Sequence, residues 1–136
     1  MRIVCDTNVL ISGVLFGGKP RRILSLAARG RITICISTAI LAEVEEVLLR
    51  PKFALSPARI SATLELFQQT FLHVSPSRHF QVVEDDPDDD AIIEAAVAAN
   101  AEVIVTGDKH LLKIGKWREI EMLTPEGFLA RRFPIP

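Results

Sequence analysis

The sequence lacks the patterns that take a chain into or across a membrane. It has no run approaching the ~20 apolar residues of a membrane-spanning helix, and its N-terminus lacks the charged-then-apolar order of a signal peptide. We therefore expect a cytoplasmic protein that makes no membrane contact.

Cysteine is also scarce, with only Cys5 and Cys35 in the chain. Both lie in apolar, strand-like runs, where a cysteine of an intracellular protein is usually a small buried residue. There is no CxxC pair or Cys/His cluster, and the histidines His73, His79 and His110 have no partners at ligand spacing. Neither a disulfide nor a zinc site is therefore expected. The absence of a GxxxxGK loop followed by Ser or Thr argues against a nucleoside triphosphatase.

Charge is nearly balanced overall but unevenly distributed. The 136 residues include 16 basic and 17 acidic ones, for a net charge of −1. Six of the acids fall between Glu84 and Asp90, so the rest of the chain carries 16 basic and 11 acidic residues, or +5. The segment from Thr7 to Ala42 has no acid, and its basic residues are Lys19, Arg21, Arg22, Arg29 and Arg31. This segment is either a footprint for phosphates or an ordinary solvated helix face.

The length and the apolar content predict one domain, residues 1–136, with a sizeable core. Apolar runs rich in Val and Ile predict strands near residues 2–5, 32–36, 102–106 and 120–123, with a short extended piece near 71–74. Caps, prolines and apolar stripes predict helices near residues 7–15, 20–30, 38–50, 56–69, 88–99 and after 124. Strands that alternate with helices indicate an α/β fold with a parallel sheet between helical layers.

Carboxylates are expected to gather at one edge of this sheet. Asp6 and Asp108 each follow one of the apolar strands. The carboxyl ends of parallel strands meet at a single edge, where the N-termini of the connecting helices also lie. Glu43, in the second turn of the third predicted helix, and Asp90, in the first turn of the fifth, belong to the same edge. We expect these four side chains to approach one another.

Each of these acids also has an ordinary structural explanation. Asp6, Asp90 and Asp108 could cap helices, and Glu43 could be a solvent-facing helical residue. Four independent roles of this kind need not fall on one edge, however, and clustered carboxylates repel one another. A hard divalent cation, Mg²⁺ or Mn²⁺, held by carboxylate oxygens and water suits the set, and such an ion supports phosphodiester hydrolysis.

Other polar residues are candidates for supporting roles. Asn8 could orient a ligand or a phosphate, and Thr106 could hydrogen-bond a carboxylate, although both could equally serve local turns. The candidate RNA contacts are Lys19, Arg21, Arg22 and Lys109.

Four motifs of the chain, in this order, resemble those of PIN-domain proteins. They are Asp6-Thr7-Asn8-Val9-Leu10, Glu43 in a helix after a strand, Asp90-Ala91-Ile92-Ile93-Glu94-Ala95-Ala96, and Val105-Thr106-Gly107-Asp108. The resemblance covers essentially the whole chain and is strongest to the toxin components of bacterial and archaeal toxin-antitoxin pairs, the virulence-associated-protein-C type among them. Two stretches resemble one subgroup of these toxins: Arg50-Pro51-Lys52-Phe53 and Thr106-Gly107-Asp108-Lys109-His110-Leu111-Leu112.

The resemblance implies a three-layer α/β/α fold, a metal-dependent ribonuclease activity on single-stranded or structured RNA, frequent homodimers and an antitoxin partner. By position, it carries the catalytic and metal-binding roles over to Asp6, Glu43, Asp90 and Asp108, with Mg²⁺ or Mn²⁺ as the cofactor. Three consecutive aspartates occupy the third position. The Ala-Ile-Ile-Glu-Ala-Ala run selects Asp90, and Asp89 could contribute to a second ion.

Three functional hypotheses follow for this chain. The first is an Mg²⁺- or Mn²⁺-dependent endoribonuclease, because four acids accompany an acid-free basic segment. The second is a non-catalytic module that keeps the fold and binds RNA or a protein, against which the presence of all four acids argues. The third is a phosphatase or phospho-receiver domain with Asp6 as nucleophile or metal ligand, but the phosphatase pattern expects a second aspartate where this chain has Asn8.

Overall fold

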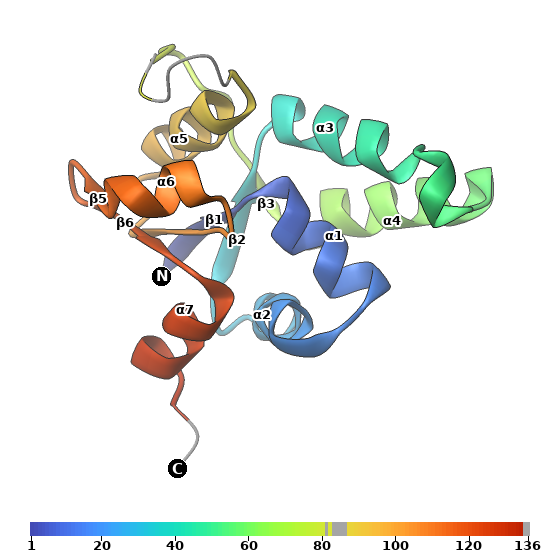
Figure 1. Cartoon of the computed structure of the whole chain (residues 1–136), viewed down its shortest axis with the longest axis horizontal. Coiled ribbons are helices and arrows are strands. Elements are labelled where there is room, and N and C mark those ends of the chain that lie inside the picture. Colours follow the sequence, from blue (N-terminus) through green and yellow to red (C-terminus); the bar gives the residue numbers. More distant parts are fainter. Residues whose placement is uncertain (81, 83–86, 135–136) are drawn as a thin grey trace.

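A six-stranded sheet with the strand order β3-β2-β1-β4-β6-β5 forms the centre of the molecule (Figure 1). The computed structural model describes residues 1–80, 82 and 87–134. The strands are β1 (Arg2–Cys5), β2 (Thr33–Ile36), β3 (Leu72–His73), β4 (Val103–Val105), β5 (Lys116–Trp117) and β6 (Ile120–Leu123). Neighbouring strands pair in parallel, except that β5 runs antiparallel to β6. The prediction of a mainly parallel sheet is confirmed.

Helices cover both faces of this sheet. They are α1 (Thr7–Leu15), α2 (Gly18–Ala28), α3 (Thr38–Leu48), α4 (Pro57–Thr70), α5 (Pro87–Ala99), α6 (Lys109–Ile114) and α7 (Pro125–Arg132), and a 3-10 turn, η1 (Pro51–Phe53), follows α3. In the view of Figure 1, α5 lies above the sheet and α2 and α7 lie below it. Helix α5 packs on β1, β2 and β4, while α2 packs on α7. The predicted order of helix, sheet and helix layers is therefore present.

The central strands β1 and β4 are buried on both faces, which explains their continuous apolar sequence. Ile3, Val4 and the three residues of β4 are 0% exposed. Each such side chain contributes about 1.5–3 kcal/mol on burial. Cys5 pairs with Val105 across the two strands. The chain therefore leaves both strands at the same level, and the residues that follow them start side by side.

Helix α3 shows how the sequence pattern positions a helix on the sheet. The Ser37 hydroxyl accepts a hydrogen bond from the Ile40 amide at 3.2 Å and so caps the helix. The predicted apolar stripe is buried at Ile40, Val44, Val47 and Leu48, whereas Leu41 is half-buried. The stripe fixes the rotation of the helix about its axis, so that a polar residue off the stripe faces the carboxyl edge of the sheet instead of the core.

The sequence did not predict two elements of the C-terminal third. Helix α6 has six residues and β5 has two, so both are too short for a periodic apolar pattern to appear. Helix α2 begins at Gly18, two residues before the predicted start at Pro20. Half of the acid-rich stretch, Glu84 to Asp86, lies outside the described residues. None of the described helices is both long enough and apolar enough to cross a membrane.

Candidate active site

A pocket of 120 Å³ lies at the carboxyl edge of the central strands. Three of the four acids predicted for the site line it, namely Asp6 from the end of β1, Glu43 from α3 and Asp108 from the loop after β4. The remaining lining residues are Thr7, Asn8, Asp88, Asp89 and Ile92. Residues separated by about a hundred positions in the sequence thus share one pocket because β1 and β4 are neighbours in the sheet.

Asp6 is held at the junction of β1 and α1 by several hydrogen bonds. Its amide continues the strand pairing by donating to the Val105 carbonyl at 3.0 Å. Its Oδ1 accepts from the Val9 amide at 2.9 Å, which caps α1, and its Oδ2 accepts from the Thr106 hydroxyl. The side chain caps a helix and lines the pocket at the same time, so the structural and functional explanations of this residue do not exclude each other.

The Asp6 carboxyl has an unfavourable environment for its charge. Burial raises its pKa above the ordinary value, and the nearby carboxylate of Asp108 adds to the rise. Hydrogen bonds from Thr106, Val9 and Gly107 lower the pKa and offset part of the effect. With only 7% of Asp6 exposed, solvent screens this charge little. A cation in the pocket would relieve the repulsion.

Thr106 links two of the acids, in agreement with the expectation that it hydrogen-bonds a carboxylate. It is 0% exposed. Its hydroxyl donates to Asp6 Oδ2 and accepts from the Asp108 amide at 2.9 Å. The same side chain therefore orients the Asp6 carboxylate and fixes the backbone that carries Asp108.

Hydrogen bonds from neighbouring groups anchor both Asp108 and Glu43. Asp108 Oδ1 accepts from the His110 amide at 2.7 Å and from the Leu111 amide at 3.4 Å, which caps α6. Glu43 Oε2 accepts from the hydroxyl of Thr7 at 2.8 Å. Thr7 was not predicted to take part in the site, although it directly follows Asp6 at the start of a helix.

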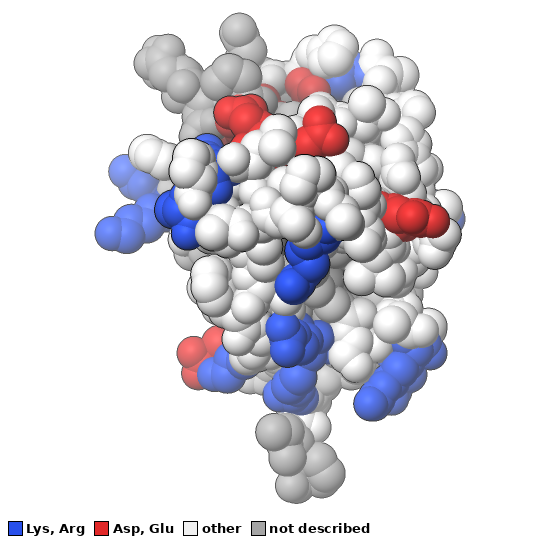
Figure 2. All heavy atoms as spheres, turned by 90° about the vertical axis from the view of Figure 1, so that its right-hand side faces the viewer, with Lys and Arg blue, Asp and Glu red and all other residues white. Residues whose placement is uncertain are grey.

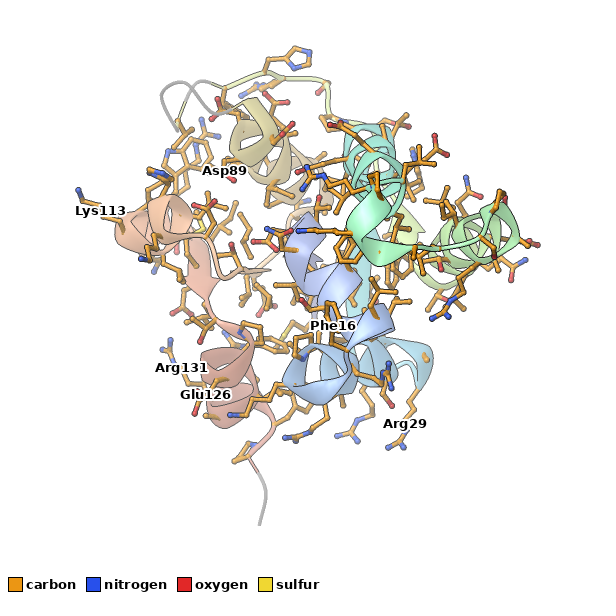
Figure 3. The ribbon with its side chains drawn as sticks, turned by 45° about the vertical axis from the view of Figure 1, so that its right-hand side comes forward. Phe16, Arg29, Asp89, Lys113, Glu126 and Arg131 are labelled. Atoms are coloured by element: carbon orange, nitrogen blue, oxygen red, sulfur yellow. The ribbon has the colours of Figure 1, made fainter. Side chains whose placement is uncertain are left out.

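The structure differs from the sequence prediction at the third acid. The carboxylate of Asp90 accepts a hydrogen bond from the Val82 amide at 2.8 Å, and Asp90 is not among the residues that line the pocket. Asp88 and Asp89 line it instead, from the first turn of α5 (Figure 3). Consecutive side chains of a helix point in directions about 100° apart, so three adjacent aspartates cannot all face one pocket. The Ala-Ile-Ile-Glu-Ala-Ala motif does not determine this rotation.

The donor set of the pocket fits a hard divalent cation. Its charged side chains are all carboxylates, and no basic residue lines it in the part of the chain that the structure describes. Oxygen ligands of this type suit Mg²⁺ or Mn²⁺, which retain several water ligands. Within the same described residues, no three His, Cys, Asp or Glu side chains are grouped closely enough to hold one ion as they stand. Binding would therefore require side-chain movement or bridging water.

The predicted basic contacts lie mostly away from the pocket. Lys19 forms an ion pair with Glu126 at 3.3 Å. Arg21 donates to the carbonyls of Gly13 and Val14, both at 2.9 Å, at the C-terminal end of α1. Asp6 lies at the opposite end of this nine-residue helix, about 13 Å away along its axis. Arg22 and Lys109 are exposed, and Lys109 directly follows Asp108.

Comparisons with known proteins support the same fold. A family model described as PIN domain matches residues 2–110. The crystal structure of VapBC2 from Rickettsia felis, bound to a DNA fragment from their promoter, contains a chain similar to this one, with a TM-score of 0.66 and 18% identity over 91% of this chain and 98% of that chain. The PIN domain of T. brucei RRP44 is similar with a TM-score of 0.53 and 18% identity over 96% of this chain and 80% of that one. No curated protein sequence matches significantly.

Proposed function

Since the chain belongs to the PIN-domain family, we propose that it is a metal-dependent endoribonuclease. The observation that carries the proposal is the shared pocket of Asp6, Glu43 and Asp108 at the carboxyl edge of the sheet. A concave site with several carboxylates and a raised pKa at one of them is typical of a functional site. Capping alone accounts for Asp6 and Asp108, but it does not account for Glu43, which lies in the second turn of α3.

Asp6 and Asp108 would be the main ligands of an Mg²⁺ or Mn²⁺ ion, with Asp89 completing the set from α5. Asp90 remains the candidate by motif, but the first turn of α5 would have to rotate by about 100° to exchange it with Asp89. When bound, the ion would neutralise the scissile phosphate and make a coordinated water more acidic. Its occupancy would also remove the repulsion between Asp6 and Asp108.

The chain's own residues would orient the reactants. Thr106 holds Oδ2 of Asp6 through its hydroxyl, which leaves the remaining lone pairs of the carboxylate for a ligand. Thr7 holds Glu43 through its Oε2, and the Glu43 carboxylate would accept a proton from the attacking water. Asn8 is exposed at the mouth of the pocket and would donate to a phosphate oxygen.

A biological role as the toxin of a toxin-antitoxin pair is part of this proposal. It is supported by the similarity to the chain from R. felis VapBC2 and by the sequence motifs. We further propose that the protein acts in the cytoplasm, forms a homodimer and is bound by an antitoxin protein. Co-purification with the product of an adjacent gene, followed by loss of RNA cleavage in the complex, would test the partner.

The nuclease activity is tested by incubating purified protein with a mixture of structured and single-stranded RNAs in Mn²⁺ or Mg²⁺. We expect cleavage that EDTA abolishes and that Asp6→Asn and Glu43→Gln reduce at least 100-fold. Glu45→Gln is the matched control, because Glu45 is an exposed acid on the same helix as Glu43. Intact RNA under all metal conditions, or full activity of Asp6→Asn, would rule out the enzyme.

The alternative is a non-catalytic PIN-like module that binds RNA or protein. Calorimetric titration with Mn²⁺ distinguishes the two hypotheses independently of any substrate. A nuclease of the proposed type binds Mn²⁺ in a manner that Asp6→Asn abolishes. A module without a metal site gives no heat that depends on Asp6.

A further inference from the structure

A second and larger depression, of 680 Å³, runs along α1 beside the carboxylate pocket. One wall is the face of α1 that includes Asn8 and Phe16, and the opposite wall comes from the end of α3, η1 and the start of α4. We call this depression the α1 groove. Asn8 lines both the α1 groove and the carboxylate pocket, so the groove opens directly beside the acids.

The α1 groove has the opposite charge to the pocket. Arg50, Lys52 and Arg59 line it and are exposed, and no acidic residue belongs to its lining among the residues described by the structure. Figure 2 shows this side of the molecule, where most of the basic side chains lie in the middle and lower parts of the face, and acidic side chains lie in its upper part, at its right edge and at its lower left. A polyanion with one phosphate at the acidic pocket would find favourable charges along the groove.

The α1 groove also carries an exposed aromatic surface. Phe16 is 73% exposed and lies at the C-terminal end of α1 (Figure 3). Its ring centroid is 6.4 Å from that of Phe53, and Lys52 Nζ lies 5.0 Å from the centroid of Phe53. A single exposed phenylalanine is common. An exposed ring beside a half-buried second ring, in a groove that basic side chains also line, has the form of a stacking platform for nucleic-acid bases.

We propose that the α1 groove binds the single-stranded RNA segment next to the scissile phosphate. Arg50, Lys52 and Arg59 contact its phosphates, and one base stacks on Phe16. Asn8 and Phe16 are about 12 Å apart along α1, which is room for a short segment of nucleic acid. Only an unpaired base is free to stack on the ring of Phe16, which favours a single strand. The inference rests on the proposed nuclease function, and it adds the path and the unpaired state of the substrate.

The basic residues and the aromatic ring together favour RNA over an acidic protein segment. Charge alone would serve both ligands equally. An acidic peptide has no planar bases, so the exposed ring of Phe16 would add little to its binding, whereas every nucleotide offers a stacking surface. The contribution of Phe16 therefore distinguishes the two ligands.

Binding is measured by fluorescence anisotropy with a labelled single-stranded 12-mer RNA in EDTA, where no cleavage occurs. The test variants are Phe16→Leu, which keeps an apolar side chain but removes the ring, and the triple variant Arg50→Gln/Lys52→Gln/Arg59→Gln. The matched control is Arg29→Gln/Lys113→Gln, at exposed basic positions outside the groove (Figure 3). Circular dichroism melting verifies that each variant is folded, which is expected because the substituted residues are exposed.

We expect Phe16→Leu to raise the Kd at least fivefold, the lower end of the effect of removing a stacked base contact. The triple variant should raise the Kd more than tenfold. It should also reduce the slope of log Kd against log salt concentration by about 2, since each phosphate contact to a single strand contributes about 0.7. The control variant should bind as the parent does, and a duplex of the same length should bind more weakly.

Two results would overturn the proposal. One is unchanged RNA binding by both groove variants. The other is that a poly-glutamate peptide displaces the labelled RNA as strongly as unlabelled RNA does, and that Phe16→Leu changes the binding of neither ligand. This result would assign the groove to an acidic protein segment.

A parallel cleavage assay with Mn²⁺ keeps the two proposals separate. If the α1 groove binds the RNA, the groove variants raise KM and leave kcat within about twofold. Asp6→Asn instead lowers kcat and still binds the 12-mer. Normal RNA binding without cleavage by the parent protein contradicts the nuclease function alone. Normal cleavage by the parent protein that the groove variants do not alter contradicts only the proposal that the α1 groove binds RNA.

Discussion

At the scale of single residues, Asp6 combines a structural role with a destabilising charge. Its Oδ1 caps α1, yet burial and the Asp108 carboxylate raise its pKa. A raised carboxyl pKa means that the unfolded chain ionises first as pH increases. The metal-free protein therefore loses stability as the pH rises from the ordinary pKa of an aspartate towards the raised pKa of Asp6.

We predict that Asp6→Asn stabilises the metal-free protein at pH 7. The amide oxygen of asparagine can still cap α1, and the buried charge is removed. An increase in melting temperature of about 2–6 °C in EDTA is expected, corresponding to about 1 kcal/mol for a domain of this size. The difference should shrink below pH 4, where the parent carboxyl is protonated. In Mn²⁺ we expect the parent to have the higher melting temperature, because only the parent gains stability from the ion. A variant less stable than the parent in EDTA would contradict this account.

Thr106 provides a second prediction, which concerns positioning. Thr106→Val keeps the shape of the side chain but removes the hydroxyl that orients Asp6 and accepts from the Asp108 amide. We expect a 10- to 100-fold loss in Mn²⁺ affinity by calorimetry, as is typical when the partner of a metal ligand is removed. The amide of the half-buried Asp108 also loses its partner, at a cost of about 0.5–1.5 kcal/mol. Thr106→Ser restores the hydroxyl and should recover most of the affinity, whereas a purely steric role would make Thr106→Ser the worse variant.

At the scale of elements, the turn between α1 and α2 depends on Arg21 more than its exposure suggests. The Arg21 guanidinium donates to the last free carbonyls of α1, those of Gly13 and Val14. The helix dipole favours a cation at this position. Between the two helices, Gly17 adopts a φ of +88°, in the region that favours glycine. Arg21, a basic residue of the acid-free segment, therefore stabilises the end of α1, a role that its charge alone did not predict.

We predict that Arg21→Ala lowers the free energy of unfolding by about 1 kcal/mol, as expected for charge-assisted hydrogen bonds at an exposed helix end. Its neighbour Arg22 is exposed and serves as the control, with an expected change within about 0.5 kcal/mol for Arg22→Ala. Urea denaturation followed by circular dichroism measures both. Equal stability of the two variants would show that the contacts of Arg21 do not contribute.

The elements also show which parts of the site the sequence could predict. Strand ends and helix starts were predictable because buried strands and apolar stripes have clear patterns, and these elements bring Asp6, Glu43 and Asp108 together. The third acid was not predictable to the residue. Three consecutive aspartates leave the rotation of the first turn of α5 undetermined, and packing decides that Asp89 lines the pocket while Asp90 bonds to Val82. The contact of Thr106 with a carboxylate was expected from its place at a strand end, whereas the partner of Thr7 depends on its rotamer, which leaves no periodic signal in a sequence.

At the scale of the whole molecule, the uneven charge of the sequence corresponds to two neighbouring surfaces. The net charge of −1 conceals a carboxylate pocket and a basic groove that share Asn8. The excess of basic residues was visible in the sequence, but three of the four predicted RNA contacts, Lys19, Arg21 and Arg22, belong to the acid-free segment and the fourth is Lys109. Arg50, Lys52 and Arg59 come from a different part of the chain and reach the groove because α3, η1 and α4 pack beside α1.

The two cysteines report on the stability of the whole fold. Cys5 and Cys35 lie on the neighbouring strands β1 and β2 and are each 1% exposed. Burial raises the pKa of both thiols, and the nearby Asp6 carboxylate adds to the rise for Cys5. Neither thiol can reach solvent as a thiolate without loss of the central sheet, so their reaction with a thiol reagent should require global unfolding.

We predict that both thiols resist iodoacetamide at pH 8 in the native protein and react together once the chain unfolds in urea. The raised pKa values also predict the direction of the pH dependence. The unfolded chain releases its thiol protons near the ordinary pKa of about 8.5, whereas the folded chain retains them. The free energy of unfolding should therefore fall as the pH rises above this value, by at most about 1.4 kcal/mol per pH unit for each thiol. Cys5→Ala/Cys35→Ala should remove this slope, and a slope that persists in the double variant would assign it to other groups.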